Sequence, residues 1–84
     1  MTTLQKKMII KIAENEMAPG NGSKPKTFEE TGDVWTDCVV EDAEDKGVAT
    51  SLVNAGMVEM TCYKNKRDNT ICLTKAGFFE YLKV

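Results

Sequence analysis

Apolar residues recur along this chain mostly at the spacing of amphipathic helices, and the first such helix is predicted from about Thr3 to Met17. Thr2 precedes it and Gln5 follows three residues later, which is the spacing of a capping box. The stripe expected to face the core consists of Leu4, Met8, Ile9, Ile12 and Ala13. The lysines of this segment lie away from the stripe, so they form either a solvated face or a face that contacts phosphates.

Two more helices are predicted in the middle of the chain, after a flexible internal loop at 18–25 that holds both prolines. One runs from Asp33, as N-cap, to about Glu41, and its buried side consists of Trp35, Cys38 and Val39. The next runs from about Ala43 to Asn54, with an inward face of Val48, Ala49, Leu52 and Val53. Gly56 stands where a helix is commonly ended by a residue in the left-handed conformation.

The last third of the chain predicts a hairpin and a closing helix. Residues 57–63 alternate, with Val58, Met60 and Cys62 on one face and Glu59, Thr61 and Tyr63 on the other. Residues 70–73 supply a shorter partner strand, and the polar, basic segment 64–69 is the turn between them. Thr74 then caps a helix from Lys75 to Leu82, whose expected buried side chains are Phe78, Phe79 and Leu82.

Length and composition indicate one globular domain over residues 1–84, of the α+β class. The chain is 42% hydrophobic and 29% charged, which is typical of a folded protein, and 84 residues leave no room for a second core. No apolar run approaches the roughly 18 residues that cross a bilayer, and the first residues lack a signal-peptide core. We therefore expect a cytoplasmic protein with no membrane partner.

The residue types present argue against catalysis. The chain has no histidine, the usual general base near neutral pH and the commonest metal ligand. Its three cysteines, Cys38, Cys62 and Cys72, lack metal-binding spacing and suit reduced thiols better than a disulfide framework, although the hairpin leaves pairing of Cys62 with Cys72 open. No phosphate-binding glycine motif is present. We expect no enzyme, no cofactor and no metal.

Charge is distributed unevenly, although the net charge is only −2. Residues 1–26 carry five lysines against two glutamates, giving +3, and residues 46–84 carry six basic groups against three acidic ones, again +3. Residues 27–45 carry eight acidic groups and no basic one, giving −8. One domain could therefore present a basic face to nucleic acid and an acidic face to a basic protein.

The order of three helices, a hairpin and a closing helix resembles the winged-helix family, also called winged helix-turn-helix, of small bacterial and phage regulators. The segment Leu52-Val53-Asn54-Ala55-Gly56-Met57-Val58 is similar to that family's passage from recognition helix into wing. Leu73-Thr74-Lys75-Ala76-Gly77 is similar to its passage from wing into the last helix. The resemblance covers 43–84 through these motifs and the first half only through helix order. It implies a mostly helical fold that binds double-stranded DNA.

Two functions follow as hypotheses. In the first, the chain is a transcriptional regulator or phage accessory factor, with groove contacts from Lys46, Thr50, Ser51 and Asn54 and phosphate contacts from Lys64, Lys66 and Arg67. The alternative is a protein-interaction module, in which the acidic surface at 29–45 meets a basic protein through Glu41, Asp42, Glu44 and Asp45. A homodimer is open under either hypothesis.

Overall fold

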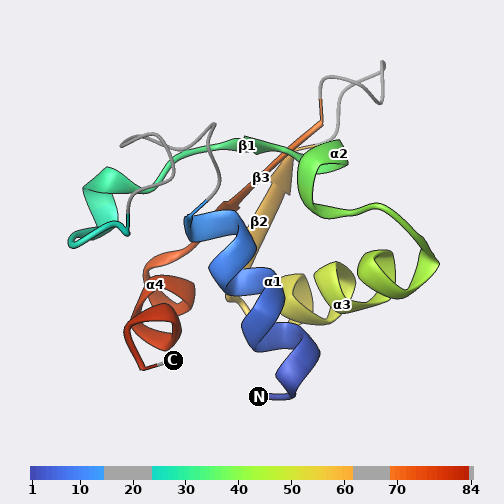
Figure 1. Ribbon diagram of the computed structural model, residues 1–84, viewed down its shortest axis with the longest axis horizontal. Coiled ribbons are helices and arrows are strands. Elements are labelled where there is room, and N and C mark those ends of the chain that lie inside the picture. Colours follow the sequence, from blue (N-terminus) through green and yellow to red (C-terminus); the bar gives the residue numbers. More distant parts are fainter. Residues whose placement is uncertain (15–23, 62–68, 84) are drawn as a thin grey trace.

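The structure, a computed structural model, describes residues 1–14, 24–61 and 69–83. Within these residues the order is α1, η1, β1, α2, α3, β2, β3, α4, where η1 is a 3₁₀ helix (Figure 1). The bounds are α1 Thr3–Ala13, η1 Phe28–Glu30, β1 Val34–Trp35, α2 Thr36–Val39, α3 Ala43–Asn54, β2 Val58–Thr61, β3 Thr70–Leu73 and α4 Lys75–Leu82. The fold is α+β, as predicted.

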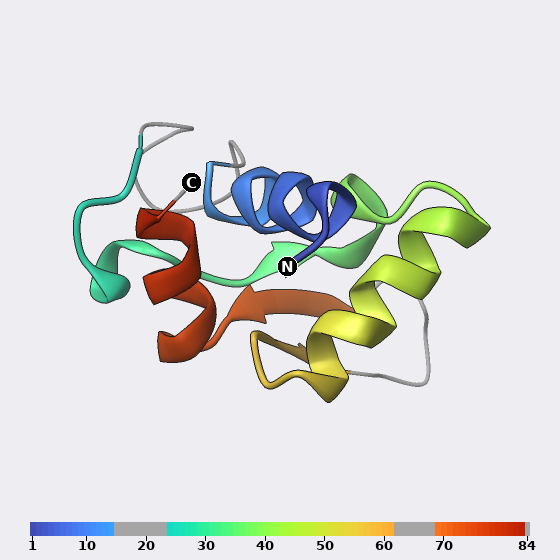
Figure 2. The same cartoon turned by 90° about the horizontal axis from the view of Figure 1, so that it is seen from below.

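The three strands form an antiparallel sheet in the order β1-β3-β2. β3 is central: Ile71 faces Val34 of β1 on one side and Met60 of β2 on the other. The inner face of the sheet is covered by α1, which also contacts α3 and α4 and lies between them in Figures 1 and 2. The largest fully buried side chains all belong to this one core and are Ile9, Ile12, Leu52, Ile71, Val34, Val39 and Val58.

Helix α1 begins as its sequence predicts. Thr2 and Gln5 form both hydrogen bonds of the capping box, and four residues of the predicted stripe are buried: Met8, Ile9, Ile12 and Ala13. The prediction for Leu4 is wrong, because the first turn of α1 extends beyond the sheet and leaves this side chain 45% exposed. The helix ends at Ala13, and the predicted continuation to Met17 falls at 15–17, outside the described residues.

The predicted helix from Asp33 to Glu41 is wrong. Its first part is strand β1, and only one helical turn follows, with Trp35 rather than Asp33 at the N-cap position. Trp35 is 42% exposed and Cys38 is exposed, so of the three side chains expected in the core only Val39 is buried. The physical reason is that pairing with β3 buries Val34 and satisfies the backbone of that sheet edge, which outweighs a short helical pattern.

Helix α3 has the predicted bounds, and its end is fixed by a Schellman motif. The N–H of Met57 donates to the carbonyl of Leu52 at 2.9 Å and that of Gly56 to Val53 at 3.0 Å. Gly56 has a φ of 75°, the left-handed conformation that glycine adopts at least cost. The buried side of the helix is narrower than predicted: Ala49 and Leu52 are buried, Val48 is half-buried, and Val53 is 38% exposed.

The two predicted strands pair as β2 and β3, and α4 has the predicted bounds. Along β2 the side chains alternate as expected, although positions 62–68 lie outside the described residues. The predicted orientation of α4 is wrong in part, because Phe78 is buried together with Gly77 and Tyr81, whereas Phe79 and Leu82 are exposed. Gly77 explains this rotation. A Cβ at this position would lie 1.9 Å from the carbonyl oxygen of Met57, so only a glycine lets this side of α4 face the turn after α3.

Candidate nucleic-acid interface

The outer side of α3 presents a row of short or slender side chains. Lys46, Gly47, Thr50, Val53 and Asn54 are all exposed there. The hydroxyl of Thr50 donates to the carbonyl of Lys46 at 2.9 Å, which holds it against the helix. The structure therefore brings three of the predicted groove residues, Lys46, Thr50 and Asn54, to one exposed side of one helix. A helix whose outer surface lacks bulky side chains can lie close to the base edges in the major groove of DNA.

Ser51, the fourth predicted groove residue, lies elsewhere. It is half-buried where α3 packs against α1, and its hydroxyl donates to the carbonyl of Val48 at 2.7 Å. The same oxygen accepts from the side-chain amide of Gln5 at 3.1 Å. Gln5 also caps α1, so this contact fixes how α1 and α3 sit together. Ser51 thus positions the helix, and its hydroxyl is already occupied within the domain.

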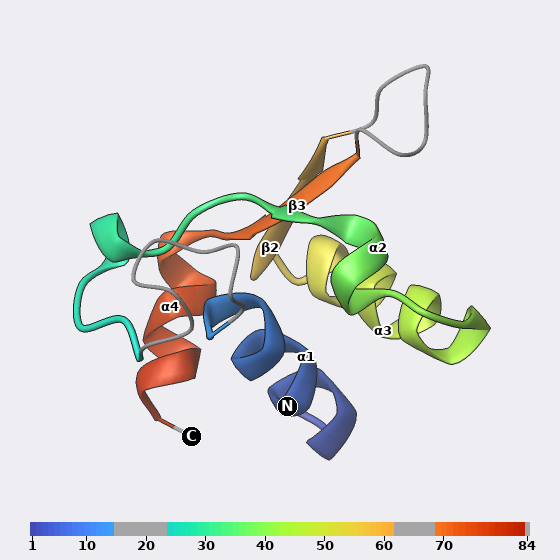
Figure 3. The ribbon, with the colours of Figure 1, turned by 45° about the horizontal axis from the view of Figure 1, so that its top comes forward.

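The predicted phosphate contacts, Lys64, Lys66 and Arg67, lie outside the described residues. The strands that lead to them are described, and they point away from the helical body (Figure 3). The end of β3 that lies next to the hairpin turn is tied to the start of α2, where the N–H of Thr36 donates to the carbonyl of Asn69 at 3.0 Å. This bond connects the hairpin to the helix pair α2–α3.

The acidic run before α3 is largely occupied by local bonds. Asp42 is the N-cap, and its carboxylate accepts from the N–H of Asp45 at 2.9 Å. The carboxylate of Asp45 in turn accepts from the N–H of Glu41 at 3.0 Å. Glu41 lies 4.0 Å from the ammonium of Lys11, in an exposed ion pair that contributes little to stability. Negative charge near a helix start is favourable in general because it complements the helix dipole. Two aspartates three residues apart at that start additionally indicate the capping hydrogen bonds seen here.

Cys72, in β3, lies on the outer face of the sheet, opposite the buried side chains of Ile71 and Leu73. Burial, followed by a hydrogen bond with Asp33, raises the pKa of Cys72 to about 11, and nearby Glu59 acts in the same direction through its charge. Cys72 therefore stays a thiol, which is the unreactive form. Cys38 and Cys72 are both free, and Cys62 is not among the described residues. The residues that the structure describes contain no group of three acidic or cysteine side chains able to hold a metal ion.

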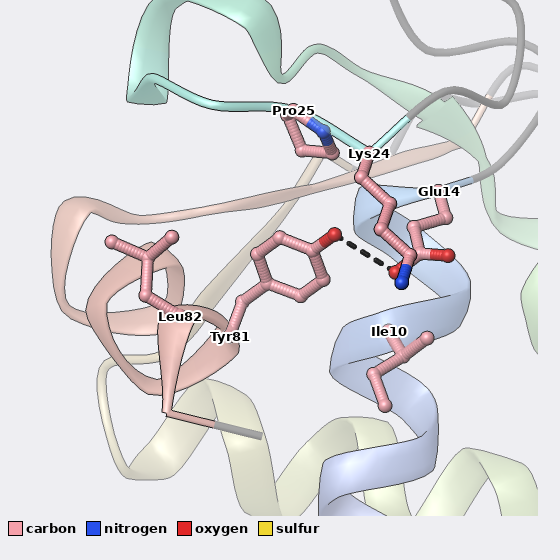
Figure 4. Close-up of a pocket in the computed structure, with 6 residues that line it drawn as sticks. All are labelled: Ile10, Glu14, Lys24, Pro25, Tyr81 and Leu82. Atoms are coloured by element: carbon pink, nitrogen blue, oxygen red, sulfur yellow. Dashed lines mark hydrogen bonds between the residues drawn. The ribbon is translucent and has the colours of Figure 1, made fainter.

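A cleft of about 450 Å³ lies between α1 and α4 and is lined by Ile10, Glu14, Lys24, Pro25, Tyr81 and Leu82 (Figure 4). The Tyr81 hydroxyl donates to the Glu14 carboxylate at 2.8 Å. Burial and this bond raise the pKa of Tyr81 to about 12, so the phenol stays neutral over the physiological range. The bond joins the end of α1 to α4, and no local pattern predicts it because its partners lie 67 residues apart.

Comparison of the chain with models of protein families, with curated proteins and with solved structures gives no match. None of the described helices has the length and apolar character needed to cross a membrane.

Proposed function

We propose that this protein binds double-stranded DNA through the outer side of α3 and the β2–β3 hairpin, as a small regulator or accessory factor with a winged-helix layout. The observation that carries the proposal is the row Lys46, Gly47, Thr50 and Asn54, exposed on one helix that follows a one-turn helix and a short turn. The sheet order β1-β3-β2, with a projecting hairpin next to that helix pair, supports the same layout.

The distribution of charge suggests different roles for the hairpin and for α3 in the proposed DNA contact. The carboxylates at 41–45 surround the start of α3 and repel phosphates, even though Asp42 and Asp45 are hydrogen-bonded. Attraction to the backbone must then come from the hairpin, where the sequence places Lys64, Lys66 and Arg67. Thr50 and Asn54 lie later in α3 than the acidic run, and they are the side chains proposed to meet base edges. We therefore expect weak binding to random duplexes and a marked preference for particular sites.

The test begins with selection of preferred sites from a random duplex library, followed by fluorescence anisotropy at several salt concentrations. Changing Lys64, Lys66 and Arg67 to alanine should weaken binding to every duplex. The slope of log affinity against log salt should fall by up to about 0.9 for each phosphate that the variant no longer neutralises. Changing Thr50 or Asn54 to alanine should alter site preference with nearly the same slope.

A matched control removes three positive charges elsewhere, at Lys6, Lys75 and Lys83, which are exposed on α1, α4 and the end of α4. This variant has the same net charge as the hairpin variant and should bind almost as the wild type does. Equal weakening in the two variants would mean that only overall charge matters. Failure to select any site, together with no salt-dependent binding at low salt, would end the DNA proposal.

A second candidate function is binding of a basic protein, and the observation that favours it is the exposure of Glu41, Asp42 and Glu44 side by side at the start of α3. Asp42 and Asp45 hold the helix cap, so the informative variant is Glu41→Gln with Glu44→Gln, which leaves the cap intact. A protein partner captured from the host should bind the wild type and fail to bind this variant, in a salt-sensitive manner. A partner retained by the variant does not use this surface.

A further inference from the structure

The two most exposed large apolar side chains in the described part of the chain lie on one helix. Phe79 is 63% exposed and Leu82 is 54% exposed. They are three residues apart in α4 and so are neighbours on its surface. Single exposed apolar residues are common, whereas an apolar patch that extends over neighbouring residues is a candidate surface for association with another molecule.

The cleft between α1 and α4 adjoins this pair of side chains. Leu82 belongs to its lining, and Figure 4 shows Leu82 and Ile10 on either side of the Tyr81 ring, with Pro25 above them. The cleft measures about 450 Å³, whereas an enclosed cavity of roughly 150 Å³ holds a benzene ring. An aromatic side chain from another molecule therefore has room beside Ile10, Pro25 and Leu82.

We propose that this face is the interface of a symmetric homodimer, in which Phe79 of each copy enters the α1–α4 cleft of the other. A two-fold interface uses the same patch on both subunits, so the patch must contain both a projecting group and a recess for it. Phe79 supplies the projecting group, and its neighbour on α4, Leu82, lines the recess, so the two parts adjoin each other. The dimer uses the α1–α4 face alone and forms whether or not α3 binds DNA.

The charges on this face favour a second copy over a strongly charged partner. Glu14 and Lys24 both line the cleft, and Glu80 and Lys83 form an ion pair of 3.3 Å on α4. Acidic and basic groups are thus interspersed, so two identical faces can meet without one sign of charge opposing itself. An acidic or basic peptide would be better matched by a rim of the opposite sign.

The expected affinity follows from the size of the face. A standard interface buries about 800 Å² per partner, which is about one seventh of the 5475 Å² accessible surface of this chain. An interface built from two exposed side chains and one open cleft should bury less area than this standard value. We therefore expect the dimer to dissociate in the micromolar range.

Sedimentation equilibrium of the full chain from about 10 μM to about 1 mM brackets that dissociation constant. The wild type should rise from its monomer mass of 9.3 kDa toward twice that value. Phe79→Glu should weaken association by roughly 30-fold or more, as expected for an aromatic residue at the centre of an interface. Leu82→Gln should weaken it less.

The matched control is Leu4→Glu, because Leu4 is also an exposed apolar residue on a helix, at 45%, and lies outside the α1–α4 cleft. This variant should associate as the wild type does, and circular dichroism should show both glutamate variants folded. An isotope-filtered NOE between the Phe79 ring and the Ile10 methyl groups of another copy would support the proposed contact. A wild type that stays monomeric at every concentration, or equal weakening by Leu4→Glu, would overturn the proposal.

Discussion

Replacing Gly77 with alanine should destabilise the protein strongly, although alanine is the better helix former. A Cβ at this position would lie 1.9 Å from the carbonyl oxygen of Met57 and 2.9 Å from its carbonyl carbon, and both of these atoms are backbone. Real Cβ contacts essentially never fall below 3.0 Å, so α4 must move by about 1.1 Å or more. The same site holds two hydrogen bonds, from the N–H of Thr74 to Met57 and from its hydroxyl to Gly56.

The magnitude follows from these contacts. Overpacking of a tight site costs about 1 to 3 kcal/mol, and each weakened hydrogen bond about 1 kcal/mol. Higher helix propensity offsets about 0.5 to 1 kcal/mol. The expected decrease in the free energy of unfolding is thus about 2 to 4 kcal/mol, a large part of the stability of a domain of this size. Urea unfolding followed by circular dichroism measures it, with an unchanged slope showing that the unfolded state is the same.

Gly47 provides the matched control, because it is also inside a helix but has no atom within 4 Å of the position where a Cβ would stand. Gly47→Ala should therefore stabilise the protein by about 0.5 to 1 kcal/mol. The two glycine-to-alanine changes should shift the urea midpoint in opposite directions. A midpoint for Gly77→Ala at or above that of the wild type would refute the argument from close backbone approach.

Three further predictions concern single side chains or turns. The pKa of Tyr81 is raised from 10.0 to about 12, so the folded state binds this proton more tightly than the unfolded state does. The stabilisation is present below pH 10 and is lost as the pH rises toward 12. In urea unfolding at several pH values, the free energy of unfolding of the wild type should fall at alkaline pH by about 2 to 3 kcal/mol more than that of Tyr81→Phe. Asp42→Ala should cost about 1 kcal/mol in thermal unfolding by removing the cap on the Asp45 N–H, whereas Asp42→Asn should keep most of it. Gly56→Ala, at a φ of 75°, should cost about 1 to 2 kcal/mol in the same assay, and an unchanged stability would contradict the left-handed assignment.

The elements that sequence predicted well are those whose ends carry local chemical signals. Helix α3 has an aspartate at its start and a left-handed glycine beyond its end, and α4 has Thr74, whose hydroxyl accepts from the N–H of Gly77. Such signals act within a few residues and can be read from the chain directly. The exposed row with Lys46, Thr50 and Asn54 was predictable for the same reason, since helical spacing alone places these residues together.

The features that sequence missed depend on contacts between distant segments. Strand β1 exists because Trp35 and Val34 pair with β3, about 35 residues later in the chain. The position of Ser51 depends on Gln5, 46 residues away. The rotation of α4, which exposes Phe79, is set by the approach of Gly77 to Met57. No periodic pattern of residues along the chain indicates these contacts. They determine the structure even where the local helical pattern predicts a different arrangement.

The junction around Met57 connects three elements of the fold through contacts between their backbones. The end of α3, the first residue before β2 and the start of α4 are joined there through Leu52, Gly56, Thr74 and Gly77. The closest approach in this junction is between the backbone of α4 at Gly77 and the backbone of Met57, which leaves little room for adjustment. A substitution that displaces the start of α4 at Gly77 is therefore expected to disturb the end of α3 and the start of β2 as well.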